Sequence, residues 1–108
     1  MSAGQIERLL AAVPATAAGP LRERVDGYAA AARHCEERIT ARRSELARAL
    51  RDAAAADRSV DAVDEAIRVA GELDALERVR PRIDSWLRLA VSAVLDDQRP
   101  APLGEGLA

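Results

Sequence analysis

The feature that most restricts the fold is a repeat of inward positions that runs without interruption from residue 21 to residue 56. These positions alternate in steps of 3 and 4, the heptad spacing of a helix that packs along another helix. The segment holds no proline, and its one glycine, Gly27, costs a long helix only about 1 kcal/mol. The repeat predicts a helix whose inward face carries Val25, Tyr28, Ala32, Cys35, Ile39, Arg42, Leu46, Ala49, Ala53 and Ala56.

A second periodic stretch predicts a helix over 60–97. Ser59 suits its N-cap, because a serine hydroxyl accepts a hydrogen bond from a backbone N–H of the first helical turn. The regular alternation of steps of 3 and 4 is lost beside Gly71, where Ala70, Leu73 and Leu76 follow one another in two steps of 3. Pro81 lacks the N–H that an unbroken helix uses, so it predicts either one kinked helix or two helices. The expected inward residues are Val60, Val63, Ile67, Ala70, Leu73, Leu76, Val79, Ile83, Leu87, Ala90 and Val94.

These two segments, nearly equal in length, are joined only by the short polar hinge Asp57-Arg58-Ser59. So short a connection makes them fold back on each other as an antiparallel hairpin over 21–97. With two aromatic residues in 108, the chain cannot furnish the core of an all-β or α/β domain. The sequence therefore predicts an all-α fold.

The rest of the chain is organised around this hairpin. Residues 3–13 show a short amphipathic pattern that predicts a helix, and the proline-containing segment 14–20 predicts a connector. Residues 99–108 show no periodicity and are expected to form a flexible tail. We therefore expect a single helical domain over 1–98.

The hairpin is expected to associate, because alanine occupies many of its inward positions and buries little area. The free energy gained by burying these inward positions barely offsets the conformational entropy that the chain loses on folding. The short helix covers part of the exposed side, and a second copy or a partner protein would complete a helical bundle.

Charge and cysteine content limit the partners. The chain has 16 Arg, no Lys and 18 Asp or Glu, and a net charge of −2 gives no general attraction to nucleic acid or anionic membranes. Cys35 is the one cysteine, so no intrachain disulfide forms, and no apolar run is long enough for a membrane span. We expect a cytoplasmic protein without a membrane partner. Arginine without lysine, together with abundant alanine, indicates a GC-rich bacterial genome.

No pattern in the sequence predicts catalysis or a cofactor. His34, Cys35, Glu36 and Glu37 are contiguous, but neighbours on a helix point about 100° apart and cannot chelate one metal ion together. A thiol in the middle of a packed helix is also a poor nucleophile. We expect neither an enzyme nor a bound metal or cofactor, and no small-molecule substrate.

Arg42 occupies an inward position where leucine or alanine is usual. Pairing the two helices about residue 58 places it opposite Asp74, with Glu77 one turn further on. One hypothesis is an inward ion pair that fixes the register of the hairpin. The other is that the slip beside Gly71 turns both residues outward to solvent.

Trp86 is the one tryptophan and lies beside the inward residues Ile83 and Leu87. It either packs in the core or against the short helix, or it forms an exposed anchor for a partner, because tryptophan is favoured at binding hot spots.

A helical hairpin of this length resembles the small hairpin substrates of type VII secretion. That family carries Trp-x-Gly in its turn and Tyr-x-x-x-Asp/Glu after its second helix. Here the turn is Asp57-Arg58-Ser59, and Tyr28 is followed four residues later by Ala32. Neither motif is present, so the sequence assigns no family.

The predicted function is that of a non-enzymatic helical interaction module, which self-associates or acts as a small accessory subunit of a larger bacterial assembly. The alternative is a regulatory, antitoxin-like protein that contacts nucleic acid through arginine clusters on both long helices. Heparin retention or a gel shift that depends on salt would favour the alternative.

Overall fold

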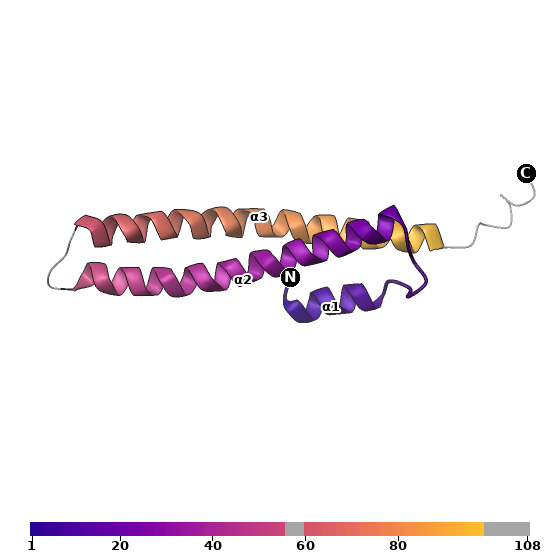
Figure 1. Ribbon diagram of the computed structural model, residues 1–108, viewed down its shortest axis with the longest axis horizontal. Helices are drawn as coiled ribbons and strands as arrows, with labels where there is room; N and C mark the ends of the chain where they lie inside the picture. The colour runs from indigo at the N-terminus through magenta and orange to yellow at the C-terminus, as the bar shows by residue number, and fades with distance from the viewer. Residues whose placement is uncertain (56–59, 99–108) are drawn as a thin grey trace, which may run out of the picture. The chain divides into compact units, whose positions relative to one another are not determined.

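The computed structural model describes residues 1–55 and 60–98, which form three α-helices and no strands. The helices are α1 (Ala3–Ala11), α2 (Pro20–Ala54) and α3 (Val60–Gln98), as Figure 1 shows. α2 and α3 pack against each other in antiparallel directions, which confirms the predicted all-α hairpin. The hinge Asp57-Arg58-Ser59, the inward residue Ala56 and the tail 99–108 lie outside the described residues.

α1 begins at a capping box that the sequence analysis did not use. The Ser2 hydroxyl accepts a hydrogen bond from the backbone N–H of Gln5 (3.2 Å), and the Gln5 side-chain oxygen accepts one from the Ser2 N–H (2.7 Å). Two backbone donors at the helix start are thereby satisfied. α1 ends at Ala11, two residues before the predicted end, and buries Ile6.

α2 begins at Pro20, directly after Gly19. Proline suits the first helical position, since the N–H it lacks has no partner there, and Gly19 adopts φ +87°, which disfavours residues with a side chain. The helix then runs through Gly27 to Ala54. The heptad positions Val25, Ala32, Cys35, Ile39 and Ala49 are buried, and Tyr28, Arg42, Leu46 and Ala53 are half-buried.

α3 packs through a different stripe from the one expected over its first half. The inward placement of Val63 and Ile67 is wrong, because these side chains are 42% and 66% exposed, while Ala66 and Val69 are buried. The positions Val60 and Val79 are also exposed. The observed seam alternates in steps of 3 and 4 without a slip through Ala66, Val69, Leu73, Leu76, Arg80, Ile83, Leu87, Ala90 and Val94, all of which are buried or half-buried.

Pro81 does not split α3, which continues as one helix from Val60 to Gln98. Pro81 is exposed, and so is Glu77, whose carbonyl group loses the N–H that a residue at position 81 would donate. On the solvent side of the helix, water can satisfy that carbonyl. The alternative of two separate helices is therefore wrong.

The chain divides into two compact units through which both long helices pass. Unit 1 comprises Met1–Ala29 and Asp84–Ala108, and unit 2 comprises Ala30–Ile83. In unit 1, α1 and the adjoining parts of α2 and α3 enclose a core of large side chains, namely Ile6, Val25, Leu87 and Val94. The prediction of a single domain over 1–98 stays a prediction.

Unit 2 consists of two helices only, and its core is made of smaller side chains. Ile39, Val69 and, at the unit's end, Ile83 are the largest buried residues that the structure describes there, and the other buried positions are Ala32, Cys35, Ala49 and Ala66. No helix within the described residues has the length and apolar character needed to cross a membrane.

The observed phase of α3 predicts a difference between two valines of the same helix. Val69→Asp places a carboxylate at a position that is 1% exposed, whereas Val79→Asp places it at one that is 44% exposed. We expect Val69→Asp to lower the free energy of unfolding by about 3–5 kcal/mol, because the buried charge has no partner. Val79→Asp is expected to cost less than about 1 kcal/mol. Urea unfolding followed by circular dichroism measures both, and equal losses would contradict this phase.

Candidate functional site

The most distinctive surface feature lies in unit 1, where the two aromatic side chains of the protein meet. Trp86 on α3 and Tyr28 on α2 have ring centroids 5.9 Å apart and ring planes tilted by 37°. Tyr28 is half-buried and supports Trp86, which remains 47% exposed. The structure thus places Trp86 at the surface rather than in the core.

These rings line a groove of about 170 Å³ together with Arg24, Leu89, Ala90 and Ala93. All of these lining residues belong to α2 or α3. In the groove, Trp86 therefore lies beside α2 and not beside the short helix α1. Leu89 is 67% exposed, so two large exposed apolar side chains, Trp86 and Leu89, lie together at this groove. Binding sites for small molecules usually enclose about 300–1,000 Å³, so this groove has the size to receive one or two side chains of another protein.

A second feature of unit 1 is a partly buried ion pair between the N-terminal residue, which precedes α1, and α3. The Met1 ammonium group lies 2.7 Å from the Asp84 carboxylate, with side-chain exposures of 0% for Met1 and 9% for Asp84. Beside it lies a hollow of about 210 Å³, lined by Met1, Gln5, Arg8, Leu9 and Arg88. Asp84 links the start of the chain to α3, and its role is to hold α1 in place.

In unit 2, Arg42 is half-buried in the seam but does not pair with Asp74. Its Nε lies 2.8 Å from a carboxylate oxygen of Glu72, and its Nη1 lies 2.7 Å from one of Glu45. Asp74 is 61% exposed and pairs with Arg78 on its own helix. The predicted Arg42–Asp74 pair is therefore wrong by two residues. Of the alternative, in which both residues turn outward, the structure confirms Asp74 and contradicts Arg42.

Glu77, the second acid expected near Arg42, pairs with Arg43 instead, at 3.2 Å. A further pair joins Arg80 on α3 to Glu36 on α2. Ion pairs at successive levels of the hairpin thus link α2 and α3 within unit 2, among them Arg42–Glu72, Arg43–Glu77 and Arg80–Glu36.

The Arg42 pair continues along α3 as a chain of charges. Glu72 also pairs with Arg68 at 2.7 Å, and Arg68 pairs with Glu65. The hydrogen bond from Arg68 holds the pKa of the Glu65 carboxyl below its ordinary value of 4.5. The pKa of Arg68 is raised by the same hydrogen bond and by the charges of Glu65 and Glu72. Glu65 and Arg68 therefore stay ionised at neutral pH, and the ion pairs form a structural network.

Cys35 is placed as a packing residue. Its thiol is buried and donates to the Leu76 carbonyl oxygen at 3.7 Å, while the neighbouring His34 is exposed. In residues 1–55 and 60–98, no group of three His, Cys, Asp or Glu side chains is arranged to hold a metal ion.

Comparison of the chain with models of known protein families, with curated proteins and with solved structures finds no match. Functional inference therefore depends on the geometry of these surfaces alone.

The revised partner of Arg42 predicts a specific energetic coupling. The Arg42 Nε and Glu72 Oε2 atoms are shielded from solvent, although both side chains remain partly exposed. In a double-mutant cycle with alanine, we expect about 1 kcal/mol of coupling between Arg42 and Glu72. We expect almost none between Arg42 and Asp74. Urea unfolding of the single and double variants measures these values, and a stronger coupling to Asp74 would restore the original pairing.

Proposed function

We propose that the protein is a non-enzymatic helical interaction module, which self-associates or serves as a small accessory subunit of a larger bacterial assembly in the cytoplasm. The observation that carries the proposal is the half-exposed Trp86, held by Tyr28 at the edge of a groove beside the exposed Leu89. Tryptophan in such a setting is the side chain most often found at binding hot spots.

The groove has the chemistry of a protein-binding site. Its floor is aromatic and aliphatic, and Arg24 supplies a single positive charge at its lining. An apolar side chain of a partner would displace water from Trp86 and Leu89, while an acidic or carbonyl group could meet Arg24. No cofactor and no small-molecule substrate is part of the proposal.

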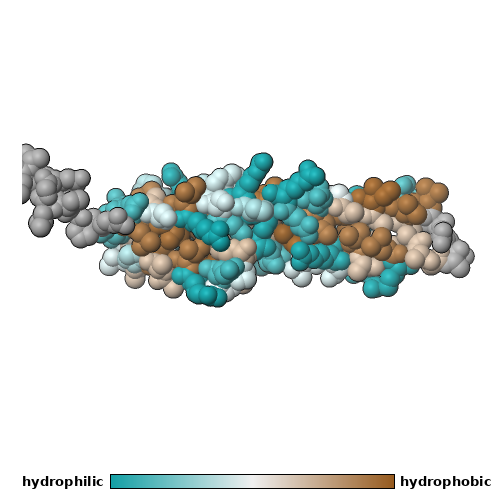
Figure 2. All heavy atoms as spheres, turned by 180° about the vertical axis from the view of Figure 1, so that it is seen from behind, coloured by the Kyte–Doolittle hydropathy of each residue, from teal (hydrophilic) through white to brown (hydrophobic). Residues whose placement is uncertain are grey.

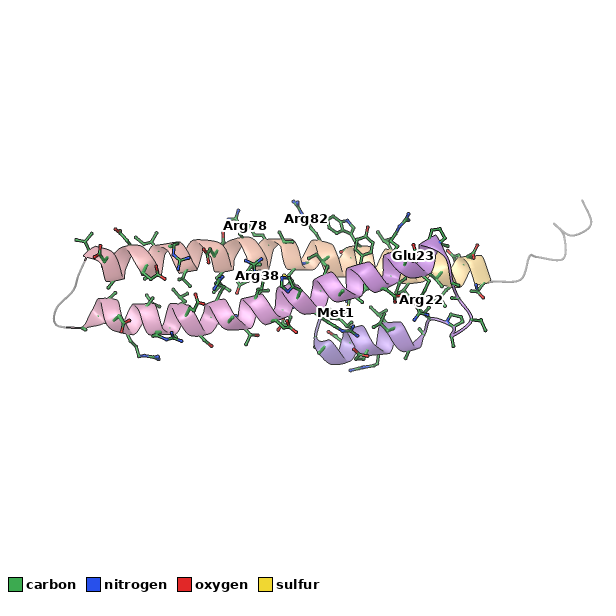
Figure 3. The ribbon with its side chains drawn as sticks, in the orientation of Figure 1. Met1, Arg22, Glu23, Arg38, Arg78 and Arg82 are labelled. Carbon is green, nitrogen blue, oxygen red and sulfur yellow. The ribbon has the colours of Figure 1, made fainter. Side chains whose placement is uncertain are left out.

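The nucleic-acid alternative is less well supported, because acids already neutralise much of the arginine cluster. Arg42, Arg43 and Arg80 pair with acids of the opposite helix, and Arg78 pairs with Asp74. Figure 3 shows Arg78 and Arg82 projecting from α3 on the side away from α2. Within the groove of unit 1, the aromatic rings lie beside only one arginine, Arg24, whereas single-stranded nucleic acid is usually bound by several cations and stacking rings together.

The proposal is tested by the effect of Trp86→Ala on binding. The partner is first identified by co-purification from the native host and then purified, and its binding to the chain is measured by calorimetry. We expect Trp86→Ala to weaken binding about 30-fold, the equivalent of a 2 kcal/mol hot spot.

Leu95→Ala is the matched control, because Leu95 is a 39% exposed apolar residue of α3 that does not line the groove. It should bind like the unsubstituted chain. Equal affinities for Trp86→Ala and the unsubstituted chain would overturn the groove as the binding site, and salt-dependent retention on heparin would replace the proposal with the nucleic-acid alternative.

A further inference from the structure

The stripe of α3 that was expected to face inward is instead an exposed apolar surface of unit 2. Val60, Val63 and Ile67 are 75%, 42% and 66% exposed and follow one another at helical spacing. On α2, Leu50 is 54% exposed. Figure 2 shows hydrophobic surface concentrated at the hairpin end of unit 2.

These residues share one flank of the hairpin. Each of Leu50 and Ile67 directly follows a buried seam residue, Ala49 or Ala66. In two antiparallel right-handed helices, the residue that follows a seam residue turns by about 100° toward the same flank on both helices. The Arg43–Glu77 ion pair demonstrates this geometry, because both of its residues follow a seam position. We call this surface the apolar flank; it carries Leu50, Ala54, Val60, Val63, Ile67 and Ala70.

The opposite flank of unit 2 has a different chemistry. Glu45, Glu72, Arg68 and Glu65 each precede a seam residue, and they form the ion-pair network described above. One flank therefore carries this network of charge pairs, and the other presents aliphatic side chains to water beside the Arg43–Glu77 pair. Exposed aliphatic side chains gathered in this way mark an interaction surface.

Unit 2 buries few of its large side chains completely. Leu46, Leu73 and Leu76 remain half-buried, and only Ile39 and Val69 of its larger side chains are within 2% of complete burial. In unit 1, by contrast, α1 supplies a third helix. Additional helices on the apolar flank would cover the large side chains that two helices leave open.

We propose that the apolar flank binds the same flank of a second copy of this chain, so that two hairpins form a four-helix bundle about a two-fold axis parallel to the helices. This inference rests on the proposed function and names one partner for it. A two-fold interface requires a surface that is complementary to itself.

The charges of the two helices meet that requirement. Residues 38–54 of α2 carry five Arg and two acids, whereas residues 60–77 of α3 carry one Arg and six acids. A two-fold axis parallel to the helices sets α2 of each copy against α3 of the other, which places helix segments of opposite net charge side by side. An axis perpendicular to the helices would set α2 against α2 and is disfavoured by like charges.

The register within the hairpin identifies one expected contact. The Arg42–Glu72 ion pair places these residues at the same level. Leu50 lies eight residues after Arg42 and is therefore level with position 64, eight residues before Glu72 and next to Val63. Leu50 and Val63 both belong to the apolar flank. The two-fold axis keeps these levels, so Leu50 would meet Val63 of the second copy.

The first test is sedimentation equilibrium of the full chain and of two variants. We expect the unsubstituted chain to reach twice its monomer mass of 11.5 kDa below ~100 µM. Ile67→Asp should raise the dimer dissociation constant at least tenfold, and Leu50→Gln should raise it in the same direction as a second probe. Val79→Asp should leave it unchanged, because Val79 precedes the seam residue Arg80 and lies off the apolar flank. Circular dichroism establishes that each variant keeps its helices.

The second test concerns the orientation of the two copies. In a Cys35→Ser background, an oxidised mixture of Leu50→Cys and Val63→Cys chains should form a disulfide between the two variants, because the two-fold axis sets position 50 of one copy against position 63 of the other. Leu50→Cys alone should cross-link far less. A monomeric unsubstituted chain at ~100 µM, equal effects of Ile67→Asp and Val79→Asp, or preferred cross-linking of Leu50→Cys to itself would overturn this arrangement. If the chain stays monomeric while partner binding still depends on Trp86, the inference fails and the proposed function stands.

Discussion

The packing of α2 against α3 is the constraint on which the rest of the structure depends. Among the described residues of unit 2, four of the seven buried seam positions hold small side chains, namely Ala32, Cys35, Ala49 and Ala66. Small seam residues let two helices approach closely, so the residues beside the seam come within reach of one another. The Arg42–Glu72 and Arg43–Glu77 ion pairs cross the hairpin on its two sides for this reason.

Close approach with little burial has a further consequence. Four of the five largest fully buried side chains belong to unit 1, where α1 contributes Ile6, and only Val69 belongs to unit 2. The thin seam of unit 2 therefore leaves its larger aliphatic residues on a flank. The proposed dimer uses those residues, and the proposed groove uses Trp86 and Leu89 of unit 1 in the same way. Both proposals rest on large side chains that lie beside the seam and remain exposed to solvent.

The sequence predicted α2 well because each of its turns offers one clear inward choice. α3 offers two, since Val60, Val63 and Ile67 form one stripe and Ala66 and Val69 form the neighbouring one. Side-chain size favours the first stripe, but the fit to α2 selects the second, and a single sequence does not show that fit. The break in spacing predicted beside Gly71 does not exist. It arose because the prediction assigned the larger residues Val63 and Ile67 to the inward face.

The candidate sites were predictable to a similar degree. The inward position of Arg42 follows from the heptad, but its partner depends on the register, and an error of two residues gave Asp74 in place of Glu72. The exposure of Trp86 could not be derived, because it depends on which face of α3 meets Tyr28. The capping box of Ser2 and Gln5 was present in the sequence as a serine followed three residues later by glutamine, and that signal was missed.

The central claim is that α3 buries one stripe against α2 and keeps the neighbouring stripe for association. The most direct test is the rate at which a maleimide labels single cysteines at positions 67 and 69 in a Cys35→Ser background. In dilute protein, Ile67→Cys should react at nearly the rate of a free peptide and Val69→Cys at least tenfold more slowly, because Val69 is buried. Raising the concentration toward ~100 µM should slow only Ile67→Cys, as the dimer covers it. Faster labelling of Val69→Cys than of Ile67→Cys would contradict the account.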